Sequence, residues 1–370
     1  MNIINKFDGK TIEFHVLQPL TMNCLNRDNN NEPKYVDIPG GGRRQRISSQ
    51  CWKYAIRKEF ISNIGYKCVS DELIKLVKNK AIEKGCEEKL AEKIAIVFNT
   101  NFGKVFSTDK SGKLKDNNTL MHISINEVDA IIDECAKDWK NALKKDKFSF
   151  KFNDVVNSVE KEIDIAMFGR MVAENINNTI EAAASFAHTQ SVNEVDSFTD
   201  WYTANLDHSR IKEDNNLHNG ACNLGDTSMM PNSIIYRYFN VSLGTLYTNV
   251  NGNINTMKEY VKDFINASFN AYPHAHQSGM TSAIRPAYIR IDVIDTCPHQ
   301  IDFNVPINEN ILENAVKRIN ECISADIEFD GCGPIKTFEM CRENSIEIEN
   351  KSNKNDMISG IISYIDSIGV

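Results

Sequence analysis

The spacing of apolar and polar residues predicts a chain that mixes strands with helices. Alternation, or a short apolar run, predicts strands at residues 11–17, 162–168, 182–189, 233–243 and 288–294. Apolar residues at helical spacing predict helices at residues 49–63, 257–269 and 311–323. With 162–168 as the second strand, the order is β-α-β-β-α-β. This is the ferredoxin-like order of an α+β fold.

A helical insertion follows the first helix in this order. Its two apolar stripes lie between residues 70 and 145, at Leu90, Ile94, Val97 and Phe98 and at Val128, Ile131, Ile132, Cys135 and Trp139. Residues 103–119 are rich in Gly, Ser, Lys and Asn and predict a mobile loop between the stripes. A second excursion, residues 193–231, is polar and cannot build a core of its own, which favours a functional role.

The first helix is predicted to follow a glycine turn and to have two unlike faces. Gly40 to Gly42 predict a break in regular structure, and Ser48 and Ser49 supply an N-cap. We expect the helix to pack by its aromatic side and to present an amide and two cations outward. The packing side holds Trp52, Ala55, Ile56 and Phe60, and the outward side holds Gln50, Lys53 and Arg57.

The average charge of the chain conceals a basic segment. The 370 residues include 42 Lys and Arg against 50 Asp and Glu, and this net charge of −8 alone makes nucleic acid an unexpected partner. Residues 27–58, however, hold eight basic and three acidic residues, a local charge of +5 that leaves −13 for the rest. The basic residues are Arg27, Lys34, Arg43, Arg44, Arg46, Lys53, Arg57 and Lys58. A solvated basic surface without a ligand is the plain alternative.

The chemistry of this segment suits phosphate groups. N–H groups at a helix start attract anions, Ser and Gln add neutral donors, and Arg binds phosphate oxygens with two parallel hydrogen bonds. The spread of cations over 30 positions suits a polyanion better than a mononucleotide, and phosphate contacts ignore base sequence. The chain has no Walker motif, no G-x-G-x-x-G after a strand, no G-x-S-x-G and no RNP1 signature. These absences argue against a nucleotide-driven motor and a conventional hydrolase.

Neither a metal site nor a membrane segment is expected. The ten cysteines form no C-x-x-C pair, and the close sets His274-Ala-His276 and Cys297-Pro-His299 lack a second pair of ligands. No apolar run approaches the roughly 18 residues that span a bilayer, and the start, MNIINKFDGK, does not resemble a signal peptide. We therefore expect a cytoplasmic protein without metal or other cofactor.

Six short blocks, in order, carry a resemblance to a known family. They are CLNRD (24–28), GGRRQRISSQ (41–50), DIAMFGRM (164–171), SFAH (185–188), VDSFTDWYTA (195–204) and YRYFN (236–240). Together they resemble the CasC-type backbone subunit of the type I-E CRISPR Cascade complex. The resemblance covers residues 1 to about 245, and the later part of the chain fits more loosely.

The resemblance implies a shape like a right hand. It predicts a modified RNA-recognition-motif (ferredoxin-like) palm, inserted helical fingers and a β-hairpin thumb. We expect the palm at residues 1–63, 159–192 and 233–370, the fingers at 64–158 and the thumb at 193–232. Several copies are expected to stack along one guide RNA (crRNA) and to support RNA-guided DNA recognition in antiviral defence.

The resemblance also implies residues and partners. The family's contacts to the guide RNA correspond here to Arg27, Lys34, Arg46, Ser48, Gln50, Lys53 and Arg57. We add Arg43, Arg44, Arg170 and Met171 as further expected RNA-binding residues. Tyr54 and Cys51 depart from the family pattern. Trp201 and Tyr202 are expected near the thumb's base, with Tyr202 wedging where a base is flipped. The implied partners are crRNA, target DNA through the guide, other copies of the chain, the large and small subunits, the repeat-processing endonuclease and the subunit that caps the guide's 5′ end.

Two other readings of the sequence stay open. Palm-and-thumb subunits of type III effectors cut RNA with an acidic residue after the first strand, where Asp28 lies here. That carboxylate could equally orient Arg27, and no second carboxylate for a metal is visible nearby, so we expect binding rather than catalysis. A stand-alone single-strand binder would instead stack bases on aromatic side chains of the sheet.

Overall fold

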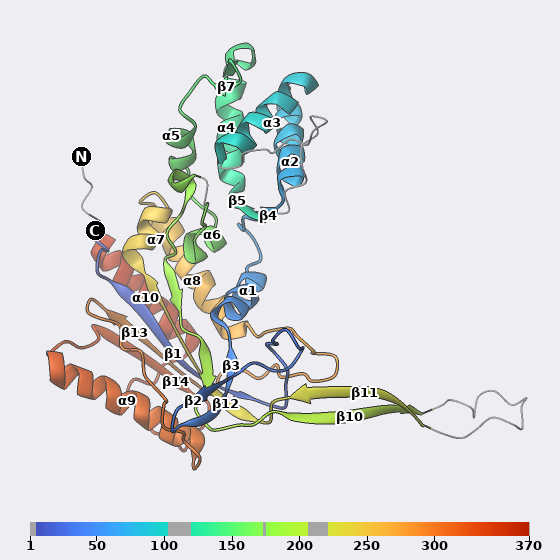
Figure 1. Ribbon diagram of the computed structural model, residues 1–370. Helices are drawn as coiled ribbons and strands as arrows, with labels where there is room; N and C mark the ends of the chain where they lie inside the picture. Colours follow the sequence, from blue (N-terminus) through green and yellow to red (C-terminus); the bar gives the residue numbers. More distant parts are fainter. Residues whose placement is uncertain (1–4, 103–119, 173–174, 206–220, 370) are drawn as a thin grey trace, which may run out of the picture.

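An antiparallel sheet forms the centre of the computed structural model, which describes residues 5–102, 120–172, 175–205 and 221–369 (Figure 1). Its strands lie in the order β14-β13-β1-β12-β9-β3-β2, and β8 also pairs with β12. Their bounds are Thr11–Leu20 (β1), Tyr35–Ile38 (β2), Gly42–Ile47 (β3), Ala184–Phe186 (β8), Thr189–Ser191 (β9), Ser233–Ser242 (β12), Tyr288–Ile294 (β13) and Lys336–Cys341 (β14).

The predicted ferredoxin-like order is present with a different second strand. The elements β1, α1, β8, β12, α8 and β13 follow one another, and their strands lie side by side as β13-β1-β12-β8. This is an α+β palm of the RNA-recognition-motif type. The helices of the palm are Ser49–Glu59 (α1), Ile163–Phe168 (α6), Leu243–Asn249 (α7), Ile254–Asn270 (α8), Ile311–Asp330 (α9) and Lys354–Gly369 (α10).

The two faces of the sheet are covered differently. On one face, apolar side chains such as Phe14, Phe239 and Ile291 pack with α1, α8 and α10 into the main core. Because side chains alternate along a strand, the neighbouring positions of β1, β12 and β13 face the other side. That side carries polar residues such as Glu13 and is buried as well, against α9 and the segment before it.

The inserted helices form a second, separate core. Figure 1 shows them rising from the palm. Their apolar stripes, predicted from helical spacing, meet in one buried cluster that includes Phe98 and Ile131. The insertion contains Ser70–Glu83 (α2), Glu88–Phe102 (α3), Ile125–Ala136 (α4), Trp139–Asn141 (η1), Phe152–Asn157 (α5) and the short strands Tyr66–Cys68 (β4), Met121–Ile123 (β5), Leu143–Lys144 (β6) and Lys147–Phe148 (β7). The loop predicted at residues 103–119 lies outside the described residues.

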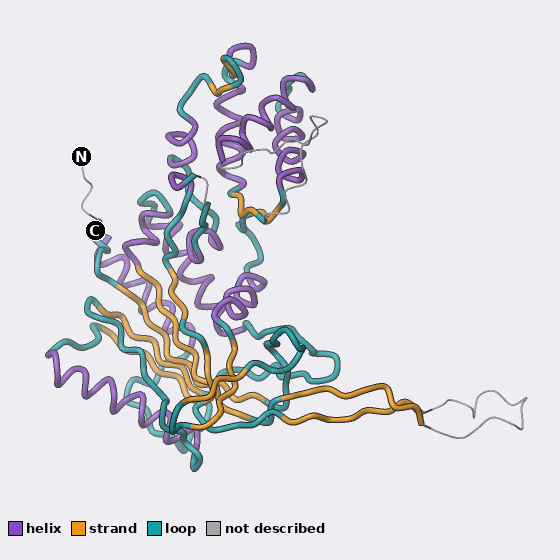
Figure 2. The backbone as a smooth tube through the Cα atoms, in the orientation of Figure 1, coloured by secondary structure: helices purple, strands orange, loops and turns teal. Residues whose placement is uncertain are grey.

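A two-stranded ribbon extends away from the palm as a thumb. Its strands, Phe198–Asn205 (β10) and Ala221–Met229 (β11), pair only with each other, as the tube in Figure 2 shows. An isolated bridge between Asn23 and Met230 joins its base to the loop that follows β1. Among the described residues, no helix is long and apolar enough to cross a membrane.

Several predicted elements need correction. Residues 162–168 form the helix α6 and not a strand: its side chains are buried nearly all round, and a short buried apolar run fits either structure. The strand predicted at 182–189 is two short strands, β8 and β9. The first helix ends at Glu59 rather than Asn63, because Phe60 turns to an extended conformation and is buried.

The C-terminal part of the chain and the glycine turn also differ from expectation. The helix predicted at 311–323 continues to Asp330, and strand β14 and helices α7 and η2 (Ile176–Asn178) were not predicted. The glycines break the chain only briefly, because Gly40 and Gly42 adopt positive φ and turn β2 into β3. Arg43 to Arg46 therefore lie on a strand, with their side chains alternating in direction.

Candidate functional site

The segment between β1 and α1 brings polar side chains together at the β2–β3 end of the sheet. Residues 21–34 fold back along β3, where the N–H of Lys34 donates to the carbonyl of Asn26 (2.8 Å) and the N–H of Arg46 donates to the carbonyl of Lys34 (3.0 Å). Helix α1 begins directly after β3. We call the side chains of Arg27, Lys34, Arg46, Gln50 and Lys53 the basic edge.

The cations of the basic edge have no carboxylate partner in the part of the chain that the structure describes. No ion pair within the described part of the chain includes Arg27, Lys34, Arg46 or Lys53. Arg27 donates only to the amide oxygen of Asn31 (3.2 Å), and Nε of Arg46 is buried without a hydrogen-bond partner. Lys53 lies over the ring of Phe186, 5.4 Å from its centroid, and burial lowers its pKa. These groups are positioned but not neutralised, which suits them to an external anion.

The start of α1 adds neutral donors to these cations. Ser48 is the N-cap, and its hydroxyl oxygen accepts the N–H of Cys51 (3.4 Å). Gln50 is exposed, and its amide oxygen accepts the hydroxyl of Ser49 (3.3 Å), so its NH₂ group faces outward as a donor group. The N–H groups of Ser49 and Cys51 already have side-chain acceptors, so the helix start adds mainly side-chain donors to the four cations of the basic edge.

His188 completes this surface and was not among the predicted site residues. The N–H of Ser49 donates to Nδ1 of His188 (3.2 Å), which leaves the ring proton of the neutral form on Nε2. Partial burial and the charges of Arg46 and Lys34 lower the pKa of His188, which favours the neutral form of this exposed ring. The one sequence signal was its place at the end of the SFAH block, residues 185–188.

The structure gives two predicted arginines an internal role instead of a place at the surface. Arg44 is fully buried, and its guanidinium donates to four backbone carbonyls, of Gly41, Ser191, Val192 and Asn304. Arg170 is buried too and forms two parallel hydrogen bonds to the carboxylate of Glu127 (2.6 and 2.9 Å). Since neither guanidinium is accessible, we leave Arg44 and Arg170 out of the interface proposed below.

Two further arginines are already paired. Arg57 donates from Nε to Asp164 (2.6 Å) and from a terminal nitrogen to the carbonyl of Gly65, and so ties α1 to the base of the fingers. Arg43 bonds Asp37 (2.9 Å) on the facing strand and stacks on Tyr35, with its guanidinium 4.0 Å from the ring centroid. Arg43 remains one-third exposed, so it borders the basic edge without belonging to its unpaired set.

Both predicted thumb aromatics are exposed, so they do not simply pack the root of the ribbon. Trp201 is 66% and Tyr202 47% exposed, and as neighbours on β10 they face opposite sides of the ribbon. Tyr202 lies opposite Gly225, where a β-bulge interrupts the pairing. Tyr202 and Arg27 line one polar hollow of about 660 Å³ between the loop 27–32, the thumb and residues 276–280.

The remaining predicted residues have distinct surroundings. Met171 is 85% exposed, next to the buried Arg170, and is free to contact a ligand. Asp28 does not orient Arg27. Its carboxylate instead accepts the N–H groups of Asn30 (2.8 Å) and Glu32 (3.0 Å) and so shapes its own loop. No group of three metal-ligating side chains found among the described residues includes Asp28.

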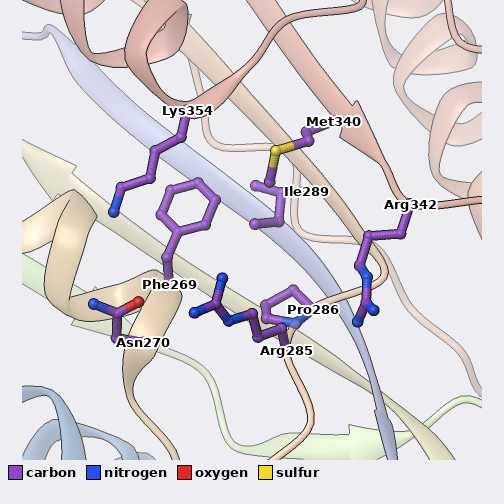
Figure 3. A pocket seen from close by; sticks show the side chains of 8 residues that line it. All are labelled: Phe269, Asn270, Arg285, Pro286, Ile289, Met340, Arg342 and Lys354. Carbon is purple, nitrogen blue, oxygen red and sulfur yellow. The ribbon is translucent and has the colours of Figure 1, made fainter.

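A second group of cations lies elsewhere, around a pocket of about 360 Å³ (Figure 3). Arg285, Arg342 and Lys354 surround a floor that includes Ile289 and Met340, and no carboxylate lines it. None of the predicted site residues contributes to this pocket. It therefore offers exposed cations that are chemically matched to the basic edge but belong to a different surface.

Comparisons with known proteins identify one family by sequence and a shared fold by structure. A family model described as "CT1975-like protein" matches residues 12–357. A chain of a solved "CRISPR RNA-guided surveillance complex, pre-nicking" has 22% sequence identity and a TM-score of 0.75, over 96% of this chain and 100% of that one. A chain of another "CRISPR RNA-guided surveillance complex" has 21% identity and a TM-score of 0.68, over 96% and 99%. Curated protein sequences give no match. At these identities the two structures establish a shared fold.

Proposed function

The chain belongs to the CT1975-like protein family, and on that premise we propose that it is the guide-RNA-binding backbone subunit of a type I-E CRISPR Cascade effector. Several copies stack along one crRNA in the cytoplasm, and each holds the RNA backbone without reading its sequence. Base pairing with the guide then recognises double-stranded target DNA. The fold shared with chains of two surveillance complexes supports this assignment. The other partners are the large and small subunits, the repeat-processing endonuclease and the subunit that caps the guide's 5′ end.

The observation that carries the proposal is the set of unpaired cations at the basic edge. Arg44, Arg57 and Arg170 are held by internal acceptors, whereas Lys34, Arg46 and Lys53 have no anionic partner among the described residues. Cations held close together repel one another unless an anion lies between them. An RNA backbone supplies phosphates in sequence, and each copy of the chain would neutralise a few of them.

We propose binding rather than catalysis for this site. The carboxylate of Asp28 is occupied by two N–H groups of its own loop, which favours a structural role for it. The rival function is that of a metal-dependent ribonuclease that uses Asp28, as in type III effectors. Replacing Asp28 by Ala should leave guide binding and assembly nearly intact. Cleavage of complementary RNA that requires both a divalent metal and Asp28 would instead establish the rival function.

The main test compares two double variants with the same loss of charge. In Arg46→Ala/Lys53→Ala we expect guide affinity to fall at least tenfold for every guide sequence, and the slope of log K against log salt to decrease by about 1.4, for two phosphate contacts on a single strand. The control, Arg285→Ala/Arg342→Ala, removes two cations of the second pocket. It should change guide affinity less than about twofold. Equal losses in the two variants, or none in the first, would exclude the basic edge as the guide site.

A further inference from the structure

A buried group of metal-ligating side chains lies on the polar face of the palm sheet. Glu13 and His15 are two residues apart on β1 and so face the same side, and Asp292 on β13 pairs directly with Glu13. All three are fully buried. Their ligand atoms lie within 4.8 Å of one another, and they form the one such group of three found among the described residues. None of them belongs to the basic edge.

The separation of Glu13 and His15 fits two ligands of one metal better than a hydrogen bond. Nε2 of His15 lies 3.7 Å from Oε1 of Glu13, beyond the range of a hydrogen bond between these atoms. Two ligands of a tetrahedral zinc ion, each about 2.1 Å from the metal, are separated by about 3.4 Å. A small inward shift of either side chain would bring both atoms into coordination.

The hydrogen bonds of His15 leave the metal-facing nitrogen without a partner. Nδ1 of His15 lies 2.9 Å from the hydroxyl of Tyr236, whose oxygen also accepts the N–H of Ile301 (3.3 Å). Nε2 is buried and has no hydrogen-bond partner. In one tautomer of His15, the hydroxyl of Tyr236 donates to Nδ1 and the proton on Nε2 lies toward Oε1 of Glu13, at the 3.7 Å given above. In the other, the proton is on Nδ1, and Nε2 has a bare lone pair. A metal cation would satisfy that lone pair.

Acidic side chains outnumber lysines and arginines on this buried face. Among the described buried residues around the group, Glu13, Asp292 and Glu339 are acidic, and Arg290 is the one basic side chain apart from the histidines. Carboxylate oxygens and imidazole nitrogens are both common ligands of divalent metal ions.

Neighbouring donors hold the two carboxylates in orientation. Oε2 of Glu13 accepts the hydroxyl of Tyr238 and the N–H of His299 (both 3.0 Å), and Oε1 lies 2.9 Å from Nδ1 of His299. The carboxylate of Asp292 accepts from Thr337 on one oxygen (2.5 Å) and from Arg290 on the other (2.6 Å). Such outer partners fix ligand groups at protein metal sites.

From these observations we propose that Glu13, His15 and Asp292 hold one divalent metal ion in a buried site that joins β1 to β13. One imidazole nitrogen and two carboxylates at this spacing suit Zn²⁺. Because the site is buried, the ion enters as the chain folds and stabilises the palm. His299 has a second imidazole nitrogen, Nε2, that is also buried without a partner beside the site.

The first test uses the full chain without substitution. Elemental analysis of the purified protein should find about one zinc per chain. Dialysis against a strong chelator should lower the melting temperature by several degrees, and added Zn²⁺, but not Mg²⁺, should restore it. Another divalent transition metal at one per chain also supports the site. Metal below about one-tenth per chain, with no change in melting temperature on addition of Zn²⁺, Mn²⁺ or Ni²⁺, would overturn the proposal.

Matched histidine variants locate the ion. His15→Gln should lose the metal and the response to chelator, because Nε2 of His15 is the proposed nitrogen ligand. The control is His122→Gln, a histidine of the fingers that bonds Asp164. It should keep one metal per chain. Metal retained in full by His15→Gln, or lost equally from both variants, would contradict this ligand assignment. The unsubstituted protein still decides whether a metal is present if His15→Gln does not fold.

Discussion

Two arginine environments in this molecule show how the same side chain serves binding or structure. At the basic edge, Arg46 has a buried nitrogen without a partner and no neighbouring carboxylate among the described residues. Where the fingers meet the palm, Arg170 is buried and doubly bonded to Glu127 of α4, and Lys161 reaches the same carboxylate (2.9 Å). Arg46 is held ready for an anion from outside, and Arg170 already has one.

This difference separates stability from recognition. Burial by itself would raise the pKa of Glu127, but Arg170 and Lys161 hold that pKa below its usual value, so the fingers contain a full negative charge in their core. Removing the charge of Glu127 leaves two buried cations, Arg170 and Lys161, to repel each other. Removing Arg46 leaves no buried charge behind among the described residues, where this arginine has no anionic partner. Substitutions in the two places should therefore affect different measurements.

The largest effect is expected for Glu127→Gln. It leaves Arg170 and Lys161 buried without a counter-charge, and such losses cost about 3–5 kcal/mol. Urea unfolding, followed by circular dichroism, should show this loss. The folded protein should bind guide RNA as tightly as the unsubstituted chain. A loss of affinity in the folded variant would show that the ion cluster around Glu127 and the basic edge are not independent.

A smaller loss, dependent on pH, is expected at Asp164. Burial alone would raise the pKa of Asp164, but His122, the N–H of Gly65 and Arg57 hold it below the ordinary value of 3.8. A lowered carboxyl pKa stabilises the fold above the unfolded-state pKa, near 4, and this contribution disappears as pH falls through the folded-state pKa. The difference in urea midpoint between the protein and Asp164→Asn should be present at pH 5 and shrink progressively below pH 4. A difference that is undiminished at pH 3 would contradict this.

Much of the palm could be predicted because its longer strands show a clear apolar pattern in the sequence. The run at 288–294 matches β13 at both ends, and the run at 233–243 differs from β12 by one residue. The second strand was misplaced because Ile163, Ile165 and Met167 alternate within a helix that is buried all round. The true second strand, β8, has three residues, too few for a pattern to reveal.

The site could be predicted less well, because sequence shows charge but not partners. Arg44 and Arg46 stand two apart in one basic run, and only the folded chain shows that Arg44 is enclosed by carbonyls of distant residues. The buried metal-ligating group combines Glu13 with Asp292, and no pattern within a short stretch of sequence can predict that residues so far apart meet. By contrast, the predicted packing face of α1, including Trp52, is buried as its periodicity indicates.

A third prediction concerns the thumb and depends on the proposed function. Tyr202→Ala should leave guide affinity within about twofold, because Tyr202 is not a cation of the basic edge. It should weaken the displacement of a base in the guide–target duplex by about 1–3 kcal/mol, the contribution of one aromatic stack. A fluorescent base analogue placed along the target strand measures this. The control Trp201→Ala, on the opposite side of the ribbon, should have little effect, and a larger effect there would make Trp201 the wedge.

The smallest effect is expected for Gln50→Ala, which compares a neutral residue of the basic edge with a charged one. Gln50 is exposed and neutral, so it contributes at most one ordinary hydrogen bond, about 0.5–1.5 kcal/mol, to a phosphate oxygen. Lys53→Ala, one turn along the same helix, removes a charge and should reduce the salt slope by about 0.7. Gln50→Ala should lower affinity equally at all salt concentrations and leave the slope unchanged, since no counterion is released by a neutral donor. Affinity measured between 50 and 200 mM salt separates the two, and a change of slope in Gln50→Ala would show that the amide orients a neighbouring cation.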